Sequence, residues 1–213
     1  MHRTTEVRWF FAGPVSRELC DWFTQGRGAA GEPRTDEYLR FPSAFVGAKF
    51  REGNFEIKAL TEHCGTRAWG GARGRVQRWV KWSCSAPPVA APRAQVTSAQ
   101  PLVVAVTKTR ALRRFALTPD ELREVPADTR RLPADGCNAE LTILRVARAQ
   151  HWTFGLEAFG YAHPTRIDEF LDVAAEHILN DPERPRRFHT QQSPRNSFAS
   201  ANSLSYPEWL QTL

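Results

Sequence analysis

Apolar and polar residues alternate one by one in several stretches of the chain, and the first such stretch covers residues 6–11. There Glu6 and Arg8 alternate with Val7 and Trp9. A period of two is typical of a β-strand, because successive side chains point to opposite faces of a sheet. Comparable patterns predict further strands at residues 37–41, 45–51, 54–60, 75–83, 102–117 (one strand or two), 138–148 and 152–160.

Three shorter segments carry the signals of helices instead. Leu19 and Phe23 stand four residues apart shortly before two glycines, as expected near the end of a helix. Thr118 precedes a proline and two acidic residues, which favours the start of a short helix. Apolar residues recur at helical spacing over residues 167–178. About eight strands and three short helices indicate an α+β, mainly β fold, in which an antiparallel sheet or barrel carries helices at its flanks.

The chain is expected to form one domain over residues 1–180, built from two halves. Residues 85–101 are rich in alanine, proline and serine and are expected to connect these halves. Residues 70–74, Gly-Gly-Ala-Arg-Gly, are expected to form a flexible loop. We expect a polar, flexible tail over residues 181–213, in which the aromatic residues of segment 206–210 offer an anchor on the domain or on a partner.

The chain is basic, with 29 Lys plus Arg against 23 Asp plus Glu and a formal net charge of +6. Such a balance favours anionic partners such as phosphates, polyphosphates, nucleotides or nucleic acid. No apolar run approaches the ~20 residues of a membrane-spanning helix, and no apolar leader follows Met1. The four cysteines are widely spaced and form no Cys-x-x-Cys pair. We therefore expect a cytoplasmic protein with free thiols and no membrane partner.

Lysine is scarce in this chain. Only four of its 29 basic residues are lysines, and each stands in a strand-like segment: Lys49, Lys58, Lys81 and Lys108. An ammonium group is a compact point charge, whereas the guanidinium of arginine is a planar fork. Because arginine supplies the ordinary surface charge, we interpret the lysines as facing an enclosed polar space that receives anions. The alternative is a compositional bias that leaves them on exposed strand faces.

Charged residues also recur two positions apart within the predicted strands. The pairs are Glu6/Arg8, Lys49/Arg51, Glu56/Lys58, Lys108/Arg110 and Glu140/Thr142, and Glu157 stands between apolar residues in the same way. In an ordinary antiparallel sheet such a face is exposed to water and the apolar face covers the core. If the sheet closes with these faces inward, it forms a lumen lined by Arg, Lys and Glu. Such a lumen would bind a polyanion directly, or through a divalent cation held by its carboxylates.

The order of these segments resembles the CYTH superfamily of triphosphate tunnel enzymes. Residues 6–10, Glu-Val-Arg-Trp-Phe, occupy the place of the family's first-strand E-x-E-x-K signature. The other similar segments are Arg34-Thr35-Asp36-Glu37-Tyr38-Leu39, Lys49-Phe50-Arg51, Phe55-Glu56-Ile57-Lys58, Val106-Thr107-Lys108-Thr109-Arg110, Ala139-Glu140-Leu141-Thr142 and Gly155-Leu156-Glu157-Ala158-Phe159. The resemblance covers roughly residues 5–160 and implies an antiparallel eight-stranded tunnel barrel with short flanking helices.

The resemblance also implies roles for individual residues. Glu6, Glu140 and Glu157 are expected to coordinate Mg²⁺ or Mn²⁺. Substrate binding falls to Arg8, Lys49, Arg51, Lys58, Lys81, Lys108 and Arg110, of which Lys58, Lys108 and Arg110 are also the candidate catalytic residues. The chain departs from the family pattern at three positions. In the first-strand signature, Arg8 replaces the second acid and Phe10 replaces the lysine; in the last strand, Phe159 replaces an acid. These losses weaken a two-metal site, and Arg8 favours binding of an anion without metal.

Three functions follow as hypotheses. The first is metal-assisted hydrolysis of a triphosphate-type anion, such as inorganic tri- or polyphosphate, a nucleoside triphosphate or thiamine triphosphate. The second is binding of the same small phosphorylated anion without turnover. The third is binding of nucleic acid through exterior arginine pairs at residues 113–114, 130–131 and 186–187. In an arginine-rich chain such pairs are also typical of plain solvated surface.

Overall fold

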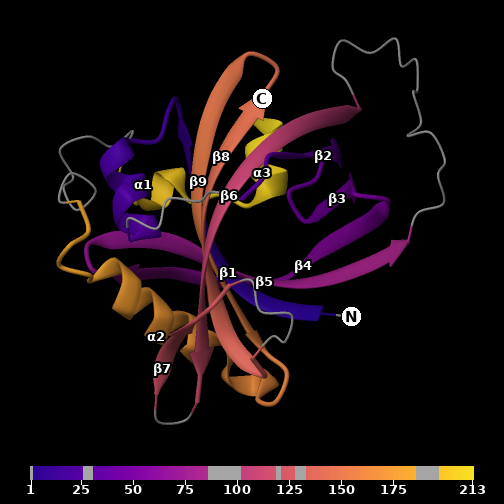
Figure 1. The fold of residues 1–213 in the computed structure, drawn as a ribbon. Coiled ribbons are helices and arrows are strands. Elements are labelled where there is room, and N and C mark those ends of the chain that lie inside the picture. The colour runs from indigo at the N-terminus through magenta and orange to yellow at the C-terminus, as the bar shows by residue number, and fades with distance from the viewer. Residues whose placement is uncertain (1, 26–30, 86–101, 119–120, 128–132, 186–196) are drawn as a thin grey trace.

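The computed structural model describes residues 2–25, 31–85, 102–118, 121–127, 133–185 and 197–213. These residues contain nine strands in a single antiparallel sheet (Figure 1). The strands are β1 (His2–Ala12), β2 (Arg34–Leu39), β3 (Val46–Arg51), β4 (Asn54–Trp69), β5 (Ala72–Ser85), β6 (Val103–Leu117), β7 (Leu122–Val125), β8 (Asp135–Val146) and β9 (Ala149–Gly160).

Eight of these strands close into a barrel. Their order is β2-β3-β4-β5-β1-β9-β8-β6, and β2 closes the ring by pairing with β6. The remaining strand, β7, pairs with the far end of β6 outside the ring. Closure leaves no unpaired barrel edge, because each barrel strand has two neighbours. The predicted α+β, mainly β class and the antiparallel eight-stranded barrel are therefore confirmed.

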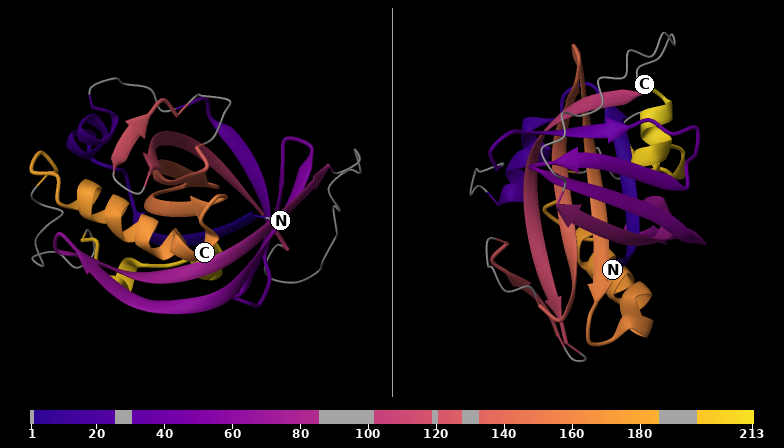
Figure 2. Two further views of the ribbon diagram at one scale, coloured as in Figure 1. Left: turned by 90° about the horizontal axis from the view of Figure 1, so that it is seen from below. Right: turned by 90° about the vertical axis from the view of Figure 1, so that its right-hand side faces the viewer.

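Three α-helices and two 3₁₀ turns accompany the barrel in the described residues. They are α1 (Arg17–Thr24), η1 (Pro164–Arg166), α2 (Ile167–Leu179), η3 (Ser200–Asn202) and α3 (Tyr206–Gln211). The Ser16 hydroxyl caps α1 by accepting a hydrogen bond from the Leu19 backbone N–H. Two views show α2 along the outside of the barrel (Figures 1 and 2).

The alternation along β1 separates two environments. Val7 and Trp9 are almost fully buried in the main apolar core, which also contains Leu19 of α1 and Leu171 of α2. Glu6 and Arg8, on the opposite face of the same strand, line a cavity inside the barrel. On β1, Val7 and Trp9 thus face the core that the helices complete, and Glu6 and Arg8 point into the barrel.

A second apolar cluster fills one end of the barrel. It joins Phe10, Tyr38 and Val106 to Trp209 and Leu210 of the C-terminal segment. Over residues 197–213, the predicted flexible tail is therefore a packed segment that ends in α3. The anchor expected at residues 206–210 is found on the barrel itself.

Two local predictions are wrong. Residues 70–74 do not form a loop, because β4 and β5 run on into a tight hairpin. Its two central residues, Gly70 and Gly71, have φ of +52° and +80°, as a two-residue hairpin turn requires. The helix predicted from Thr118 is not found in the described residues, where residues 122–125 form strand β7 and the Thr118 hydroxyl accepts a hydrogen bond from Glu121 N–H. Most of the predicted connection at residues 85–101 lies outside the described residues.

Candidate functional site

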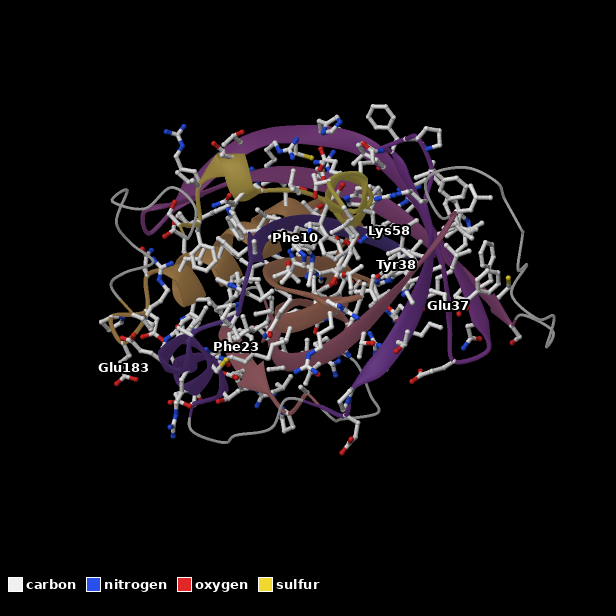
Figure 3. All side chains as sticks on the ribbon, turned by 90° about the horizontal axis from the view of Figure 1, so that it is seen from above. Phe10, Phe23, Glu37, Tyr38, Lys58 and Glu183 are labelled. Atoms are coloured by element: carbon white, nitrogen blue, oxygen red, sulfur yellow. The ribbon has the colours of Figure 1, made fainter. Side chains whose placement is uncertain are left out.

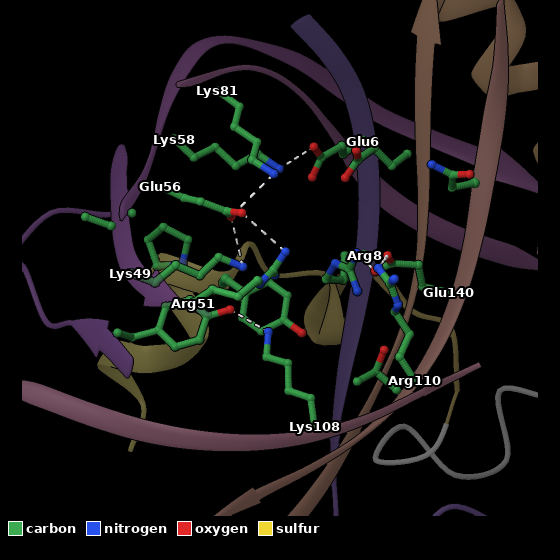
Figure 4. A pocket seen from close by; sticks show the side chains of 18 of the residues that line it. Glu6, Arg8, Lys49, Arg51, Glu56, Lys58, Lys81, Lys108, Arg110 and Glu140 are labelled. Atoms are coloured by element: carbon green, nitrogen blue, oxygen red, sulfur yellow. Dashed lines mark hydrogen bonds and ion pairs between the residues drawn. The ribbon is translucent and has the colours of Figure 1, made fainter. Parts of the chain in front are cut away.

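A cavity of about 190 Å³ lies inside the barrel. All eight barrel strands and the C-terminal segment contribute to its wall (Figure 4). The lining residues are Glu6, Arg8, Arg34, Tyr38, Gly47, Ala48, Lys49, Arg51, Glu56, Lys58, Lys81, Lys108, Arg110, Asn138, Glu140, Thr142, Glu157, Tyr206 and Pro207. Eight of them are Arg or Lys and four are Glu, so the wall carries an excess of positive charge.

The cavity brings together every residue that the sequence proposed for the site. Arg8, Lys49, Arg51, Lys58, Lys81, Lys108, Arg110, Glu6, Glu140 and Glu157 all line it. The four lysines of the chain therefore share one enclosed space. Figure 3 shows Lys58 and Tyr38 toward the middle of the molecule, whereas Glu183 lies at its edge. The binding, catalytic and metal-ligating roles of these residues remain predictions.

Glu56 holds three cations on one side of the cavity. Its carboxylate lies 3.2 Å from Lys49 Nζ, 3.3 Å from Lys81 Nζ and 3.3 Å from Arg51 Nη1. Burial opposes ionisation of Glu56, but these neighbours hold its pKa below the ordinary value. Lys58, two residues further along β4, forms an ion pair with Glu6 of β1.

Asp36 forms the second anchor for the basic residues, and sequence reasoning missed it. Its fully buried carboxylate lies 3.0 Å from Lys49 Nζ, 3.1 Å from Arg51 Nη2, 3.4 Å from Lys108 Nζ and 3.3 Å from Arg34 Nε. Although burial favours the neutral acid, hydrogen bonds from Arg51 and the charge of Lys108 hold the pKa of Asp36 far below its usual range. The sequence signal for Asp36 was its spacing: it stands two residues before Tyr38, so both side chains lie on the same, inward face of β2.

Arg8 and Arg110 share the carboxylate of Glu140 on the opposite side of the cavity. Arg8 Nη2 lies 2.8 Å from Glu140 Oε2, and Arg110 Nη1 lies 2.9 Å from Glu140 Oε1. Against the effect of burial, Glu140 raises the pKa of Arg8, and the two arginines lower the pKa of Glu140. Arg8 is therefore a fixed positive charge in the cavity wall.

Glu157 differs from the other carboxylates of the cavity. It stands directly opposite Glu6 in the pairing of β1 with β9, and no ion pair joins it to a cation in the described part of the chain. Burial and the nearby negative charge of Glu6 raise the pKa of Glu157 to about 7. This carboxyl group is consequently able to exchange a proton near neutral pH.

Two lysines of the wall also have displaced acid–base equilibria. Burial is the main cause that lowers the pKa of both Lys49 and Lys108 to about 7. Nearby cations add to the effect, and Asp36 opposes it. The positive charge of the cavity therefore increases as the pH falls through neutrality.

The C-terminal segment contributes an aromatic lid that the sequence did not assign to the site. The Tyr206 ring stacks on Tyr38 with a centroid separation of 5.6 Å, and Lys108 Nζ lies 3.9 Å from the Tyr206 centroid. Such a cation–π contact stabilises an ammonium group in a partly desolvated site. The aromatic composition of residues 206–210 was the available signal, but it did not reveal which surface the segment contacts.

The three carboxylates predicted to bind metal do not fit a divalent ion as the side chains are placed. Glu6 is paired with Lys58, and Glu140 is paired with Arg8 and Arg110. Among the described residues no three Asp, Glu, His or Cys side chains converge into a metal-binding group. A cation such as Mg²⁺ would have to displace ammonium or guanidinium groups from its oxygen ligands.

One of the arginine pairs proposed to bind nucleic acid is not on the exterior. Arg113 and Arg114 are about nine-tenths buried. Arg113 donates two hydrogen bonds to Glu124 of β7, at 2.9 and 2.6 Å, and Arg114 Nε donates to Asn138 Oδ1 at 3.1 Å. The pairs at residues 130–131 and 186–187 lie outside the described residues.

None of the described helices has both the length and the apolar character needed to cross a bilayer. In comparisons with known proteins, no family model matches the chain and no curated protein was found to be similar to it.

Proposed function

We propose that the barrel binds a small anion carrying several phosphate groups, such as inorganic tri- or polyphosphate or the triphosphate of a nucleotide or of thiamine. The observation that carries the proposal is the convergence of eight basic side chains, from six of the eight barrel strands, on one cavity. Basic groups in a site of low dielectric attract anions far more strongly than they do in water.

The distribution of the cations favours a ligand with more than one charged group. Lys58 and Lys81 lie at one side of the cavity, and Arg8 and Arg110 at another (Figure 4). Lys108 lies against the Tyr206 ring of the C-terminal segment. A single phosphate cannot contact groups that surround it so widely. The volume, about 190 Å³, is also below the ~300–1,000 Å³ typical of pockets for drug-sized ligands. A short chain of phosphates matches both properties.

Hydrolysis of the anion is the second candidate function, and Glu157 is the observation that favours it. A carboxyl group with a pKa of about 7 is suited to general base catalysis near neutral pH. In such a reaction Glu157 would accept a proton from water while the water oxygen bonds to phosphorus. The bridging P–O bond would break, and the leaving phosphate would keep its electron pair. Lys58, Lys108 and Arg110 would stabilise the charge on the phosphate oxygens.

Calorimetry of purified protein with tripolyphosphate, pyrophosphate, a nucleoside triphosphate and thiamine triphosphate tests the binding proposal, with sulfate as the anion control. Lys81→Met is the informative variant, because Glu56 keeps Lys49 and Arg51 as partners. We expect about a tenfold loss of affinity for the tightest ligand, equivalent to ~1.4 kcal/mol. Arg17→Ala is the matched control, since Arg17 is 94% exposed on α1.

Two results would contradict the proposal: no phosphorylated compound binds better than sulfate, or Arg17→Ala weakens binding as much as Lys81→Met. Release of orthophosphate from the tightest ligand then tests turnover. We expect Glu157→Gln to abolish release and to retain binding. If the wild-type protein releases no phosphate, the protein binds without turnover. Affinity for single-stranded or duplex nucleic acid that falls steeply with salt would instead support the third hypothesis.

A further inference from the structure

Arg8 lies in the cavity wall beside two of the predicted metal ligands, Glu6 and Glu140. Arg8 Nη2 lies 2.8 Å from Glu140 Oε2, and the negative charge of nearby Glu6 also raises the pKa of Arg8. The side chain is 8% exposed, and its guanidinium also lies over the Tyr206 ring, 5.2 Å from the centroid. Arg8 therefore brings a permanent positive charge to the oxygens that a divalent ion would use.

The fold has space reserved for this guanidinium. Gly155 of β9 stands between Arg8 of β1 and Glu140 of β8 in the strand pairing. A Cβ atom at position 155 would lie 2.5 Å from Arg8 Cζ and 2.8 Å from both terminal nitrogens. Only a residue without a side chain lets Arg8 reach across the middle strand to Glu140. The position of Arg8 is thus a built feature of the barrel.

Part of the hydrogen-bonding capacity at this position is unused. Arg8 Nη1 is buried and has no hydrogen-bond partner among the described residues, and the same holds for Thr142 Oγ1 in the cavity wall. A buried donor without an acceptor is unfavourable, and a charged phosphate oxygen is the strongest acceptor that a ligand offers to a guanidinium. An anion bound beside Arg8 would supply the acceptor that Nη1 lacks.

Glu6, the predicted metal ligand on β1, is already neutralised by the chain itself. Glu6 forms an ion pair with Lys58 and accepts a hydrogen bond from the Thr4 hydroxyl at 2.6 Å. Lys58 and Arg8 together supply two positive charges, the number that one divalent ion would bring.

From these observations we propose that the barrel binds its phosphorylated anion without a divalent metal, and that Arg8, with Lys58, provides the fixed cationic charge in place of one. The inference rests on the proposed function and specifies how that site binds. Tripolyphosphate would then be held by direct contacts with guanidinium and ammonium groups. Magnesium in solution would weaken binding, because it competes with the protein for the same phosphate oxygens.

Calorimetry of the wild-type protein with tripolyphosphate, in EDTA and in millimolar Mg²⁺ or Mn²⁺, tests the inference directly. We expect equal or tighter binding in EDTA. Binding that is absent in EDTA and appears with metal overturns the inference but leaves the proposed function intact. Absence of binding under both conditions overturns the proposed function and the inference with it.

Variants of Arg8 test its role separately. We expect Arg8→Gln to lose at least tenfold in affinity in EDTA, without recovery on addition of metal. Arg8→Glu places a carboxylate beside Glu6 and Glu140, where the E-x-E-x-K signature has its second acid. This variant is expected to bind tripolyphosphate only when Mg²⁺ or Mn²⁺ is present. Thermal unfolding identifies any variant that does not fold. In that case the inference is tested by the wild-type protein alone, through its binding of tripolyphosphate in EDTA and in Mg²⁺ or Mn²⁺. An Arg8→Gln protein that folds and binds as tightly as wild type in EDTA would refute the role of Arg8.

Discussion

The guanidinium of Arg8 passes directly over Gly155, and a single Cβ atom at that glycine would lie 2.5 Å from Arg8 Cζ. Neighbouring strands are ~4.8 Å apart, so Arg8 on β1 and Glu140 on β8 are separated by about twice that distance at the backbone. The long arginine side chain spans this gap only because the middle strand, β9, presents no side chain there. The identity of residue 155 thus depends on the identity of residue 8.

Gly155→Ala should therefore destabilise the protein in a way that depends on Arg8. Alanine has the better strand propensity, so without the contact the change would be neutral or favourable. With Arg8 present we expect a loss of ~1–3 kcal/mol, as for other overpacked sites. Urea unfolding of Gly155→Ala in wild-type and Arg8→Ala backgrounds measures the difference. An equal cost in the two backgrounds would show that Arg8 is not the cause.

Asp36→Asn should be the most destabilising single change among the ion-paired residues around the cavity. It leaves Arg34, Lys49, Arg51 and Lys108 without their shared negative charge. Removing one partner of a buried ion pair costs ~3–5 kcal/mol. The matched control is Asp21→Asn, which removes an exposed pair with Arg17 worth ~0–1 kcal/mol.

An added anion should partly restore the Asp36→Asn protein. Tripolyphosphate supplies negative charge to the same basic groups, so its effect on the melting temperature is expected to be larger for this variant than for wild type. Thermal unfolding with and without the ligand measures the effect. A smaller shift in the variant than in wild type would show that the cations around Asp36 do not face the ligand.

The sequence predicted the inward orientation of the charged strand faces for a physical reason. A closed sheet has only an inner and an outer face. Apolar side chains such as Val7 and Trp9 are stabilised when other apolar side chains cover them. Once α1 and α2 cover that face on the outside, Glu6 and Arg8 necessarily point into the barrel. The scarcity of lysine then identified Lys49, Lys58, Lys81 and Lys108 as members of one site.

The errors have an equally physical origin. Asp36 was overlooked because its spacing from Tyr38 gives only the face of the strand, and the four bases around it come together only when β2, β3 and β6 pair. Arg113 was read as exterior because strand β7, which carries its partner Glu124, was not predicted from the sequence. This strand is defined by its pairing with β6, a tertiary contact that the local pattern after Thr118 does not show. Local patterns carry no information of this kind.

Binding and stability should respond to pH in opposite directions above neutrality. Lys108 has a pKa of about 7 in the folded protein and ~10.4 when unfolded. Between these values the unfolded chain binds more protons, so stability without ligand should rise from about pH 7 to pH 10. The affinity for an anion should fall over the same range as Lys108 and Lys49 lose their charge.

Urea unfolding and calorimetry at a series of pH values check both slopes. Lys108→Met is the control, because it removes one of the two titrating lysines and should flatten both curves. Glu157, with a pKa of about 7, has released its proton over most of this range and adds little to the slope. A stability that is constant or falls between pH 7 and 10 would contradict the assignment of a lowered pKa to Lys108.

Removal of the Trp209 side chain should open one end of the cavity. Trp209 is buried and stacks on Phe10 with a centroid separation of 4.9 Å, so Trp209→Ala is expected to cost ~3–5 kcal/mol. It should also weaken anion binding, because α3 holds Tyr206 over Lys108. Gln211→Ala, an exposed change on the same helix, should affect neither property. If Trp209→Ala lowers stability and leaves the affinity for tripolyphosphate unchanged, the C-terminal segment stabilises the barrel but does not shape the site.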